Sequence, residues 1–330
     1  MRTSRRAFIL TTAVAILPLT LTGCGSSSDD SSGGGAQTVR IGYLADYNGT
    51  SLLAIADKEG LWKKAGLNPK LSLFTNGPLQ IQALGTNNLD FGYIGPGAMW
   101  LPASGKAKVI AVNTLGYADR VIGQPGIKSM ADLKGKKVGV PEGTSGEMIL
   151  DLALKDAGMS EKDIEKVPMD PSTVVSAFAS GQIDAAGIWY PLIDTIKERK
   201  PKLVELASSV NMPDHTFPTA YVSRTNTDNA LTEKVLKVLQ QANDWRSAHP
   251  EESVKLTAAM LKIDAAKVKA DAAHVKTLTT QELVAKTKDG SVKKWLGDLN
   301  DFFVKGGKLQ NAPDPDTYYT GDLYTKVAGK

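Results

Sequence analysis

Two Gly-Thr-Ser sequences, at residues 49–51 and 143–145, each follow a predicted strand and precede a predicted helix. Such a junction offers free backbone N–H groups, hydroxyl groups and the positive end of a helix dipole, which together suit a bound anion. One helix terminus contributes only about 0.3–1 kcal/mol, so several such contacts must converge on a ligand. Helix capping is the alternative role of Thr144 and Ser145, because Thr144 and Glu147 fit the Ser/Thr-x-x-Glu capping box.

Trp189 is the side chain best placed to form a wall of a binding site. It ends the predicted strand "DAAGIW" and precedes Tyr190-Pro191, although packing in the core is the alternative for a large aromatic side chain. At the corresponding place in the first half of the chain, Gly95 and Pro96 form a small-residue turn. Such a turn lets the backbone approach a ligand closely, so a bulky wall would face a backbone shelf.

Polar and charged loop residues supply further candidate contacts. Asn48 and Asn76 lie on strand-to-helix loops, where they could donate to an oxoanion or act only as turn and cap residues. A zwitterion needs a carboxylate for its ammonium group, whereas a plain anion does not. The candidates for this part of the site are Asp46 with its neighbour Tyr47, Asp119 and Glu142. Arg120 could bind a sulfonate or carboxylate with two hydrogen bonds, or lie in solvent beside a hinge. The residues alone leave the choice between anion and zwitterion open.

Residue types that enzymes and metal sites use are sparse in this chain. The three histidines, His215, His249 and His274, stand in unrelated contexts without metal-ligand spacing, and Cys24 is the only cysteine. The sequence Gly-Thr-Ser-Gly-Glu at 143–147 lacks the Gly-x4-Gly-Lys-Ser/Thr spacing of a phosphate-binding loop. We therefore expect a binding protein rather than an enzyme, with no metal and no cofactor.

The net charge gives little indication of a charged partner. The chain has 39 Lys and Arg residues against 35 Asp and Glu residues, a formal charge of +4. Arg2, Arg5 and Arg6 precede Cys24, so the rest of the chain has 39 − 3 = 36 basic and 35 acidic residues, or +1. The sequence has no basic block interleaved with aromatic residues, so we expect no nucleic-acid partner.

The first 23 residues have the layout of an export signal. Three arginines form a basic start, and residues 8–21 form a mostly apolar run that is shorter than the roughly 20 residues of a membrane-spanning helix. The sequence "SRRAFI" resembles a twin-arginine export motif, and a chance arginine pair in a basic start is the alternative. We expect residues 1–23 to be a signal peptide.

Cys24 follows Leu21-Thr22-Gly23, and these four residues together resemble a bacterial lipobox. That resemblance implies that Cys24 becomes the first mature residue and carries a lipid on its thiol. A free buried thiol is the alternative, but residues 25–35 contain no apolar side chain that could bury it. We expect residues 24–37 to form a lipidated flexible tether that holds a folded body at the extracytoplasmic face of the membrane.

The rest of the chain alternates short β-rich runs with helical patterns, which predicts βα units around largely parallel sheets. Two such series can be aligned: residues 49–51 match residues 143–145, and Leu89-Asp90 falls on Ile183-Asp184 at the same offset. After "TAYVSRT" the sequence becomes helical. We predict one lobe from residues 38–118 plus 223–330 and a second lobe from residues 119–222, joined by two chain crossings that form a hinge.

The order of these sequences resembles the extracytoplasmic substrate-binding proteins of ABC importers. The resemblance is carried by "IGYLADYNGTSLLAIADKEGLWKKAGL", "GPLQIQALGTNNLDFGYIGPGA", "SMADLKGKKVGVPEGTS", "AFASGQIDAAGIWYP" and "FFVKGGKL". Within that class the chain is most similar to the taurine, aliphatic-sulfonate and nitrate group, which shares its fold with thiamine-pyrimidine binding proteins. The resemblance implies an α/β, two-lobed type II periplasmic-binding-protein fold with mixed sheets, helices on their faces and a ligand cleft between lobes. It also implies a ligand-contacting tryptophan at Trp189.

The expected function follows from this resemblance. The protein would capture a small organic anion or zwitterion, such as taurine or an alkanesulfonate, and deliver it to an ABC permease and its ATPase. A thiamine-precursor pyrimidine or another small aromatic solute is the alternative ligand. A ligand-sensing lipoprotein is an alternative of another class. An enzyme similar to the pyrimidine synthase of thiamine biosynthesis is the least favoured, because the cysteine-rich motif of that enzyme is missing here.

Overall fold

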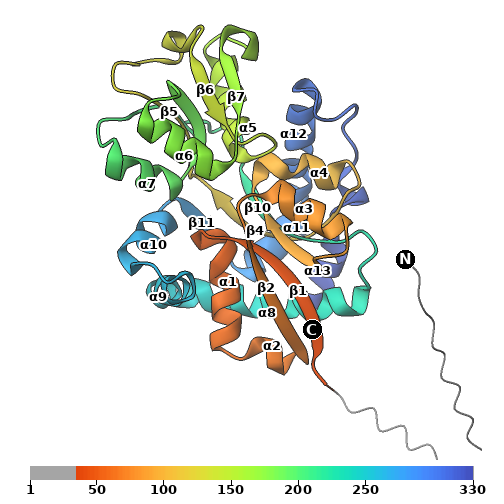
Figure 1. The fold of residues 1–330 in the computed structure, drawn as a ribbon. Coiled ribbons are helices and arrows are strands. Elements are labelled where there is room, and N and C mark those ends of the chain that lie inside the picture. Colours follow the sequence, from red (N-terminus) through yellow and green to blue (C-terminus); the bar gives the residue numbers. More distant parts are fainter. Residues whose placement is uncertain (1–34, 330) are drawn as a thin grey trace, which may run out of the picture. The chain divides into compact units, whose positions relative to one another are not determined.

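Two separate β-sheets, each flanked by helices, form the part of the chain that the computed structural model describes, residues 35–329 (Figure 1). The expected signal peptide, Cys24 and most of the expected tether lie outside these residues. Ala36–Lys330 form one unit of the chain. The predicted fold class, α/β with two mixed sheets flanked by helices, is confirmed.

The larger sheet has six strands in the order β11-β4-β10-β3-β1-β2. Strand β1 pairs in parallel with β2 and β3, while β10 runs antiparallel to β3 and β4, and β11 antiparallel to β4. We call this sheet, with the helices that pack on it, the large half. Its strands are β1 (Gln37–Leu44), β2 (Leu67–Phe74), β3 (Phe91–Ile94), β4 (Lys108–Gly116), β10 (Pro218–Ser223) and β11 (Val275–Thr277).

The smaller sheet has five strands in the order β7-β6-β8-β5-β9. Strand β6 pairs in parallel with β7 and β8, while β5 runs antiparallel to β8 and β9. We call this sheet with its helices the small half. Its strands are β5 (Asp119–Gly123), β6 (Lys137–Val140), β7 (Glu165–Pro168), β8 (Ala185–Trp189) and β9 (Val204–Ser208).

Helices cover both sheets. Those of the large half are α1 (Tyr47–Lys58), α2 (Leu61–Lys64), α3 (Gly77–Gly85), α4 (Trp100–Ala103), α8 (Asn229–Ala248), α9 (Pro250–Leu261), α10 (Ala265–Ala272), α11 (Thr280–Lys288), α12 (Ser291–Lys305) and α13 (Gly321–Ala328). Those of the small half are α5 (Ser145–Asp156), α6 (Pro171–Ser180) and α7 (Leu192–Arg199). Short 3-10 helices are η1 (Pro96–Ala98), η2 (Met130–Leu133), η3 (Glu161–Asp163), η4 (Ser209–Asn211) and η5 (Pro315–Thr317).

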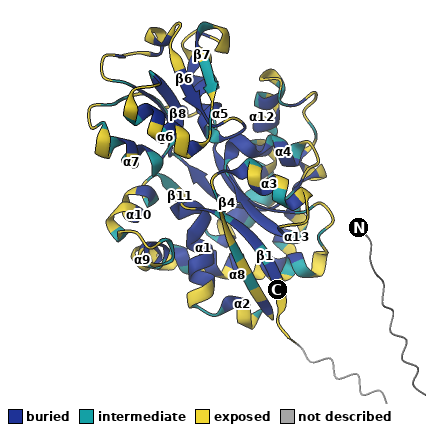
Figure 2. Ribbon diagram, in the orientation of Figure 1, coloured by how far each residue is buried: buried dark blue, intermediate teal, exposed yellow. Residues whose placement is uncertain are grey.

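The central strands of both sheets are buried on both faces. Every residue of β3 and β5 is buried, and so is every residue of β4 after Lys108. Strands covered by helices on both sides need apolar residues in nearly every position rather than in alternate ones. Figure 2 shows the central strands in dark blue inside the molecule, and the exposed residues on the outer faces of the helices and on edge strands such as β2. This burial explains the continuous apolar runs of the sequence.

The chain passes from the large half to the small half between β4 and β5, and returns between β9 and β10. Strand β10 already pairs with β3 and β4, so the return falls between Ser208 and Pro218. The division into lobes at residues 119–222 stays a prediction. The two crossings lie side by side at the junction of the sheets, because Gly116 N–H, at the end of β4, donates to the carbonyl oxygen of Phe217, just before β10.

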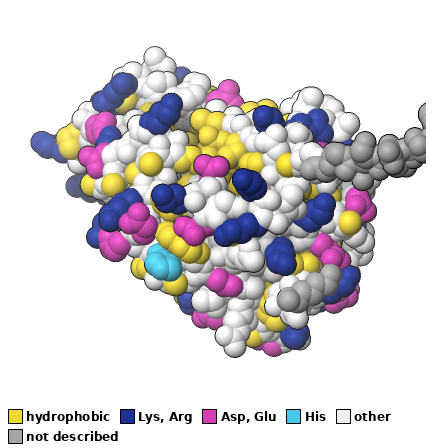
Figure 3. Space-filling view, turned by 90° about the horizontal axis from the view of Figure 1, so that it is seen from below, with side chains coloured by type: hydrophobic (Ala, Val, Ile, Leu, Met, Phe, Trp, Pro, Cys, Tyr) yellow, Lys and Arg dark blue, Asp and Glu magenta, His cyan; other side chains and the backbone are white. Residues whose placement is uncertain are grey.

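None of the helices within residues 35–329 is long and apolar enough to cross a membrane. On the face shown in Figure 3, basic and acidic side chains are interspersed, and hydrophobic side chains gather in one patch between them.

Candidate ligand-binding site

A cavity of about 50 Å³ lies between the two halves. A single water needs roughly 10–15 Å³ by this measure, so the cavity has room for a small solute. Most of the residues that the sequence predicts for the site come together around it. The predicted residues that line it are Asp46, Asn48, Asn76, Gly95, Pro96, Asp119, Thr144, Ser145 and Trp189.

The loop after β1 brings Asp46 to the cavity. Asp46 caps α1, since its Oδ1 atom accepts from the backbone N–H of Gly49 at 2.6 Å. The helix therefore begins at Tyr47, two residues before the first Gly-Thr-Ser sequence. Thr50 N–H donates to the carbonyl oxygen of Asp46, and the Thr50 hydroxyl donates to that of Leu44. The expectation of free N–H groups and hydroxyls at residues 49–51 is wrong, because Asp46 accepts from the N–H groups of Gly49 and Thr50, and Leu44 and Arg246 bond the hydroxyl groups of Thr50 and Ser51.

The second Gly-Thr-Ser sequence does lie at a helix N-terminus. Thr144 caps α5 by accepting from Gly146 N–H at 3.2 Å, and Ser145 is the first helical residue. Glu147 accepts a hydrogen bond from the N–H of Gly143 at 2.7 Å rather than from that of Thr144. The predicted capping role of Glu147 is thus carried out one residue further upstream, and Thr144 and Ser145 both reach the cavity.

Trp189, the last residue of β8, pairs with Asp119, the first residue of β5, so both lie at the end of these strands that faces the cavity. The Trp189 side chain is half-buried, since it packs against the hydrophobic core of the small half and also lines the cavity. The next residue, Tyr190, also lines the cavity and stacks on His274 of the large half with ring centroids 4.1 Å apart. Its hydroxyl group donates to Glu205 at 2.5 Å.

Two buried carboxyl groups determine the charge of the cavity. Burial raises the pKa of Asp46 to about 6, although the N–H of Gly49 works against this. Burial likewise raises the pKa of Asp119 to about 6; the charge of Asp46 adds to the increase, while Ser145 and Arg120 oppose it. The Oδ1 atom of Asp119 has no hydrogen-bond partner among the described residues. No Lys, Arg or His of the described part lines this cavity.

A third acid lies behind Asp46. Asp271, on α10, accepts a hydrogen bond from the N–H of Tyr47 at 2.6 Å. Burial, with the charge of Asp46, raises its pKa to about 8. The Tyr47 hydroxyl is bonded to that of Ser253 at 2.6 Å, so Tyr47 is directed into the large half and does not line the cavity.

Two more predicted residues lie away from the cavity. Arg120 donates to Glu205 at 2.8 Å and to the carbonyl oxygens of Tyr117 and Asp119, so its guanidinium group is used within the small half. Glu142 is exposed and lies 3.9 Å from the amine of Lys166. It borders a separate surface hollow with Asn76 and Asp170. The structure therefore does not bring Tyr47, Arg120 or Glu142 together with the other candidates.

Sequence reasoning missed several lining residues. Tyr93 lies on β3 and Thr219 on β10, strands far apart in sequence that meet only through sheet pairing. Gly77 and Pro78 open α3 beside Asn76. Tyr93 could have been predicted, because it lies two residues before the candidate Gly95 at the end of the same strand. Nothing in the sequence indicated Thr219.

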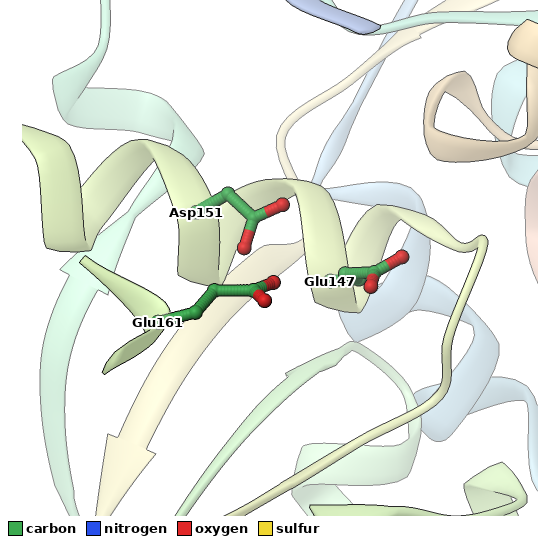
Figure 4. A group of neighbouring side chains, drawn as sticks. All are labelled: Glu147, Asp151 and Glu161. Atoms are coloured by element: carbon green, nitrogen blue, oxygen red, sulfur yellow. The ribbon is translucent and has the colours of Figure 1, made fainter. Parts of the chain in front are cut away.

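A second group of acids, outside the cavity, consists of Glu147 and Asp151 on α5 and Glu161 on η3 (Figure 4). Their carboxylate oxygens lie within 4.8 Å of one another. The amine of Lys166 lies 3.0 Å from Glu147 and 2.5 Å from Glu161, and the amine of Lys308 lies 2.9 Å from Glu147. These ammonium groups already supply the positive charge that such a cluster requires.

The two sheets, with a small cavity where strand ends and helix N-termini of both halves meet, define a substrate-binding protein of the two-lobed periplasmic type. Residues 49–253 match the family described as NMT1/THI5 like, and the chain belongs to that family. A protein of Brucella abortus that is named only as a binding protein is 57% identical over 291 residues, covering 87% of this chain and 91% of the relative.

More distant relatives are named for sulfonates. A protein of Bacillus subtilis named as an aliphatic sulfonates-binding protein is 28% identical, covering 76% of this chain and 77% of the relative. Among solved structures, the alkanesulfonate-binding protein of Xanthomonas axonopodis, bound to MOPS, has a TM-score of 0.67 at 23% identity and covers 86% of this chain and 97% of its own. A desulfurization enzyme has a similar fold, with a TM-score of 0.65 at 15% identity, covering 89% and 99%.

Proposed function

We propose that the protein captures a small solute with an amine group, such as the zwitterion taurine, and delivers it to an ABC permease and its ATPase. The observation that supports this choice is the pair of buried carboxyl groups of Asp46 and Asp119 at a cavity without a basic side chain from the described residues. A buried carboxylate is costly unless it is paired. An ammonium group of the solute would be that partner.

The anionic end of a zwitterion would meet helix N-termini. Asn76 and Thr144 cap α3 and α5 and line the cavity, whereas the carboxylate of Asp46 already occupies the N-terminus of α1. Each helix N-terminus attracts negative charge by about 0.3–1 kcal/mol. A plain anion such as nitrate or an alkanesulfonate would gain the same contacts but would be repelled by the two carboxylates. This balance favours a zwitterion over the ligands for which the more distant relatives are named.

An aminopyrimidine is the second candidate ligand. Tyr93, Trp189 and Tyr190 place three aromatic side chains around the cavity, and a flat ring could stack on them. The ring's amino group could donate to Asp46 or Asp119. We favour binding over catalysis for either ligand, because a lone cysteine at position 24 and histidines without metal-ligand spacing offer no reaction machinery.

Titration calorimetry with taurine, ethanesulfonate, nitrate and an aminopyrimidine tests this proposal. We expect taurine to bind at least tenfold more tightly than ethanesulfonate, because the two solutes differ by the amine. If only the aminopyrimidine binds, the second candidate is the ligand of this site. Binding of nitrate or ethanesulfonate in preference to taurine would contradict the role given to the carboxyl groups.

Replacing Trp189 tests the wall of the site. We expect Trp189→Ala to weaken binding at least tenfold, equivalent to about 1.4 kcal/mol, and to leave the melting temperature of the empty protein nearly unchanged. Trp62, which is 3% exposed, is the matched control. Trp62→Ala should cost about 3–5 kcal/mol of stability, because it leaves a cavity in the core. Equal losses of stability in both variants would make Trp189 a packing residue.

We also propose that Cys24 carries a lipid that anchors the protein at the extracytoplasmic face of the membrane, after removal of residues 1–23. The lipobox-like sequence before Cys24 and the apolar run of residues 8–21 support this. These residues lie outside the described part of the chain. The full-length protein should sediment with membranes, and Cys24→Ala should release or mislocalise it. Ser26→Ala is the control and should remain bound. Unchanged retention of Cys24→Ala would contradict the anchor.

A further inference from the structure

A second hollow lies beside the candidate site. Its volume is about 310 Å³, and it lies between the end of β2 in the large half and the starts of α6 and α7 in the small half. Most of its lining is apolar. The apolar residues that line this hollow and not the cavity are Ala45, Leu73, Phe74, Pro171, Pro191 and Leu192. Leu73 is 59% exposed, so its side chain is accessible to a solute in the hollow.

The hollow adjoins the small cavity. Leu44, Asp46 and Trp189 line both spaces, so only these side chains stand between them. One face of the site is thus small and acidic, and the other is larger and apolar. A solute held by Asp46 in the small cavity would reach the hollow by extending past Trp189, which lines both spaces.

We infer that the hollow is a subsite for an apolar extension of the transported solute, so that the solute is a longer amine rather than taurine itself. This inference rests on the proposed binding of an amine at Asp46 and Asp119. The apolar extension would pack on the indole of Trp189 and on Leu73 and Leu192. Closure of the two halves would bury it, since the lining comes from both.

The physical reason is the burial of apolar surface. The small cavity of about 50 Å³ fills with a few non-hydrogen atoms, whereas the hollow of about 310 Å³ lies within the range of small-molecule sites. Each methylene group that enters it from water should improve affinity roughly fourfold. A protein that binds only short polar solutes would not need the hollow beside the small cavity.

A series of primary amines tests the inference on the whole mature protein. Ethylamine, butylamine, hexylamine and 2-phenylethylamine share one head group and differ in the extension, and taurine is the reference without an apolar extension. We expect affinity to rise from ethylamine to hexylamine by at least tenfold in calorimetry. Equal affinities along the series, or binding of taurine without any of the simple amines, would overturn the inference while leaving the proposed amine site intact. No binding of taurine or of any amine would instead contradict the proposed function.

A variant pair locates the effect. Leu73→Ser removes an apolar side chain that lines the hollow and not the cavity, and should lower the ratio of hexylamine to ethylamine affinity about fivefold. Val210, 56% exposed and outside both spaces, is the control, and Val210→Ser should leave the ratio unchanged. An unchanged ratio in Leu73→Ser would overturn the placement of the extension in this hollow.

Discussion

The carboxyl groups of Asp46 and Asp119 are the unusual side chains of this protein. Asp46 is 9% exposed and Asp119 is 3% exposed, yet neither forms an ion pair among the described residues within 4 Å. Asp and Glu are seldom buried without a partner, and titratable groups shifted by burial are concentrated at functional sites. The Oδ1 atom of Asp119 also has no hydrogen-bond donor in the described part. Both observations favour a donor that arrives with the solute.

Binding of an amine should strengthen as the pH rises through about 6. Burial holds the pKa of both Asp46 and Asp119 at about 6 in the empty protein, and a bound ammonium group would lower it, so binding releases protons. An aliphatic amine stays protonated over this range. Tyr93 and Tyr190 also line the cavity, and Arg120 and Asp271 lie beside the pair. Asp271, with its pKa raised to about 8, should extend the increase in affinity to higher pH.

Calorimetry with taurine at pH 5, 6, 7 and 8 measures this dependence, and buffers of different ionisation enthalpy count the released protons. A plain anion should behave in the opposite way and bind more tightly as the carboxylates become protonated at low pH. Affinity that falls between pH 5 and 7 would therefore exclude the amine as the group held by these acids.

Asp119→Asn should stabilise the empty protein while weakening amine binding more than tenfold. The folded-state pKa of Asp119 is raised from its ordinary value of 3.8 to about 6, so the ionised carboxylate costs stability above that pH and none below about 4. Removing the charge should add about 1–3 kcal/mol to the free energy of unfolding at pH 8. Urea titrations at pH 4 and 8 test this. The exposed Asp57, as Asp57→Asn, is the control and should change neither value.

At the scale of elements, the N-terminus of α5 is fixed from both halves of the molecule. Burial alone would raise the pKa of Glu147, but the N–H of Gly143 and the ammonium groups of Lys308 and Lys166 outweigh it and lower the pKa. Lys308 follows α12 of the large half, whereas Lys166 lies on β7 of the small half. Glu147 thus holds in place the turn that presents Thr144 and Ser145 to the cavity.

Glu147→Gln should lower the free energy of unfolding by about 1–3 kcal/mol at pH 7. Breaking a buried ion pair costs about 3–5 kcal/mol, and the cost is smaller here because Lys166 retains Glu161 and Lys308 is partly exposed. Because the pKa of Glu147 is lowered in the folded state, its carboxylate stabilises the fold above the ordinary value of 4.5. The difference in unfolding free energy between the variant and wild type should therefore shrink as the pH falls below 4.5. Urea unfolding at pH 7 and 3.5 measures it.

Glu142→Gln is the matched control for this prediction. Glu142 stands in the same turn, is half-exposed, and lies 3.9 Å from the same lysine. Exposed ion pairs contribute about 0–1 kcal/mol, so this variant should be close to wild type. If both variants lose the same stability, the turn is not held by Glu147 in particular.

At the scale of the whole molecule, the two halves touch across the cavity. Besides the Glu147–Lys308 pair, Lys267 on α10 lies 2.6 Å from Glu198 on α7. The closest approach is at Gly97 on η1, where an added Cβ would lie 2.0 Å from the carbonyl carbon of Thr144 and 2.2 Å from the nitrogen of Ser145. Both are backbone atoms, which cannot turn aside. This arrangement of the halves therefore requires glycine at position 97.

Gly97→Ala should prevent the halves from closing on a solute. The variant should lose at least tenfold in affinity for taurine and show no compaction in small-angle scattering at a solute concentration that compacts the wild type. Gly85→Ala, where a Cβ meets nothing within 4 Å, is the control and should bind normally. Wild-type compaction in Gly97→Ala would contradict a closing movement across this contact.

The sequence could predict the fold class because local pattern carries it. Alternating β-rich runs and helical patterns, with Gly-rich junctions between them, suffice to indicate βα units, and the resulting α/β class is confirmed. The start of α1 could not be placed so well. A competing cap, Asp46, stands three residues before Gly49 and begins the helix early, so the two Gly-Thr-Ser sequences, alike as letters, differ in role.

For the candidate site, the sequence by itself identified residues at strand ends and helix starts, since the topology of an α/β sheet sends those to one edge. The sequence could not show which carboxyl groups lack an ion-pair partner in the folded protein. Glu142 and Asp119 look alike in sequence, but Glu142 lies in solvent near Lys166, whereas sheet pairing places Asp119 opposite Trp189 and inside the cavity. Burial and pairing depend on contacts between distant segments, so only the tertiary structure decided the charge of the site.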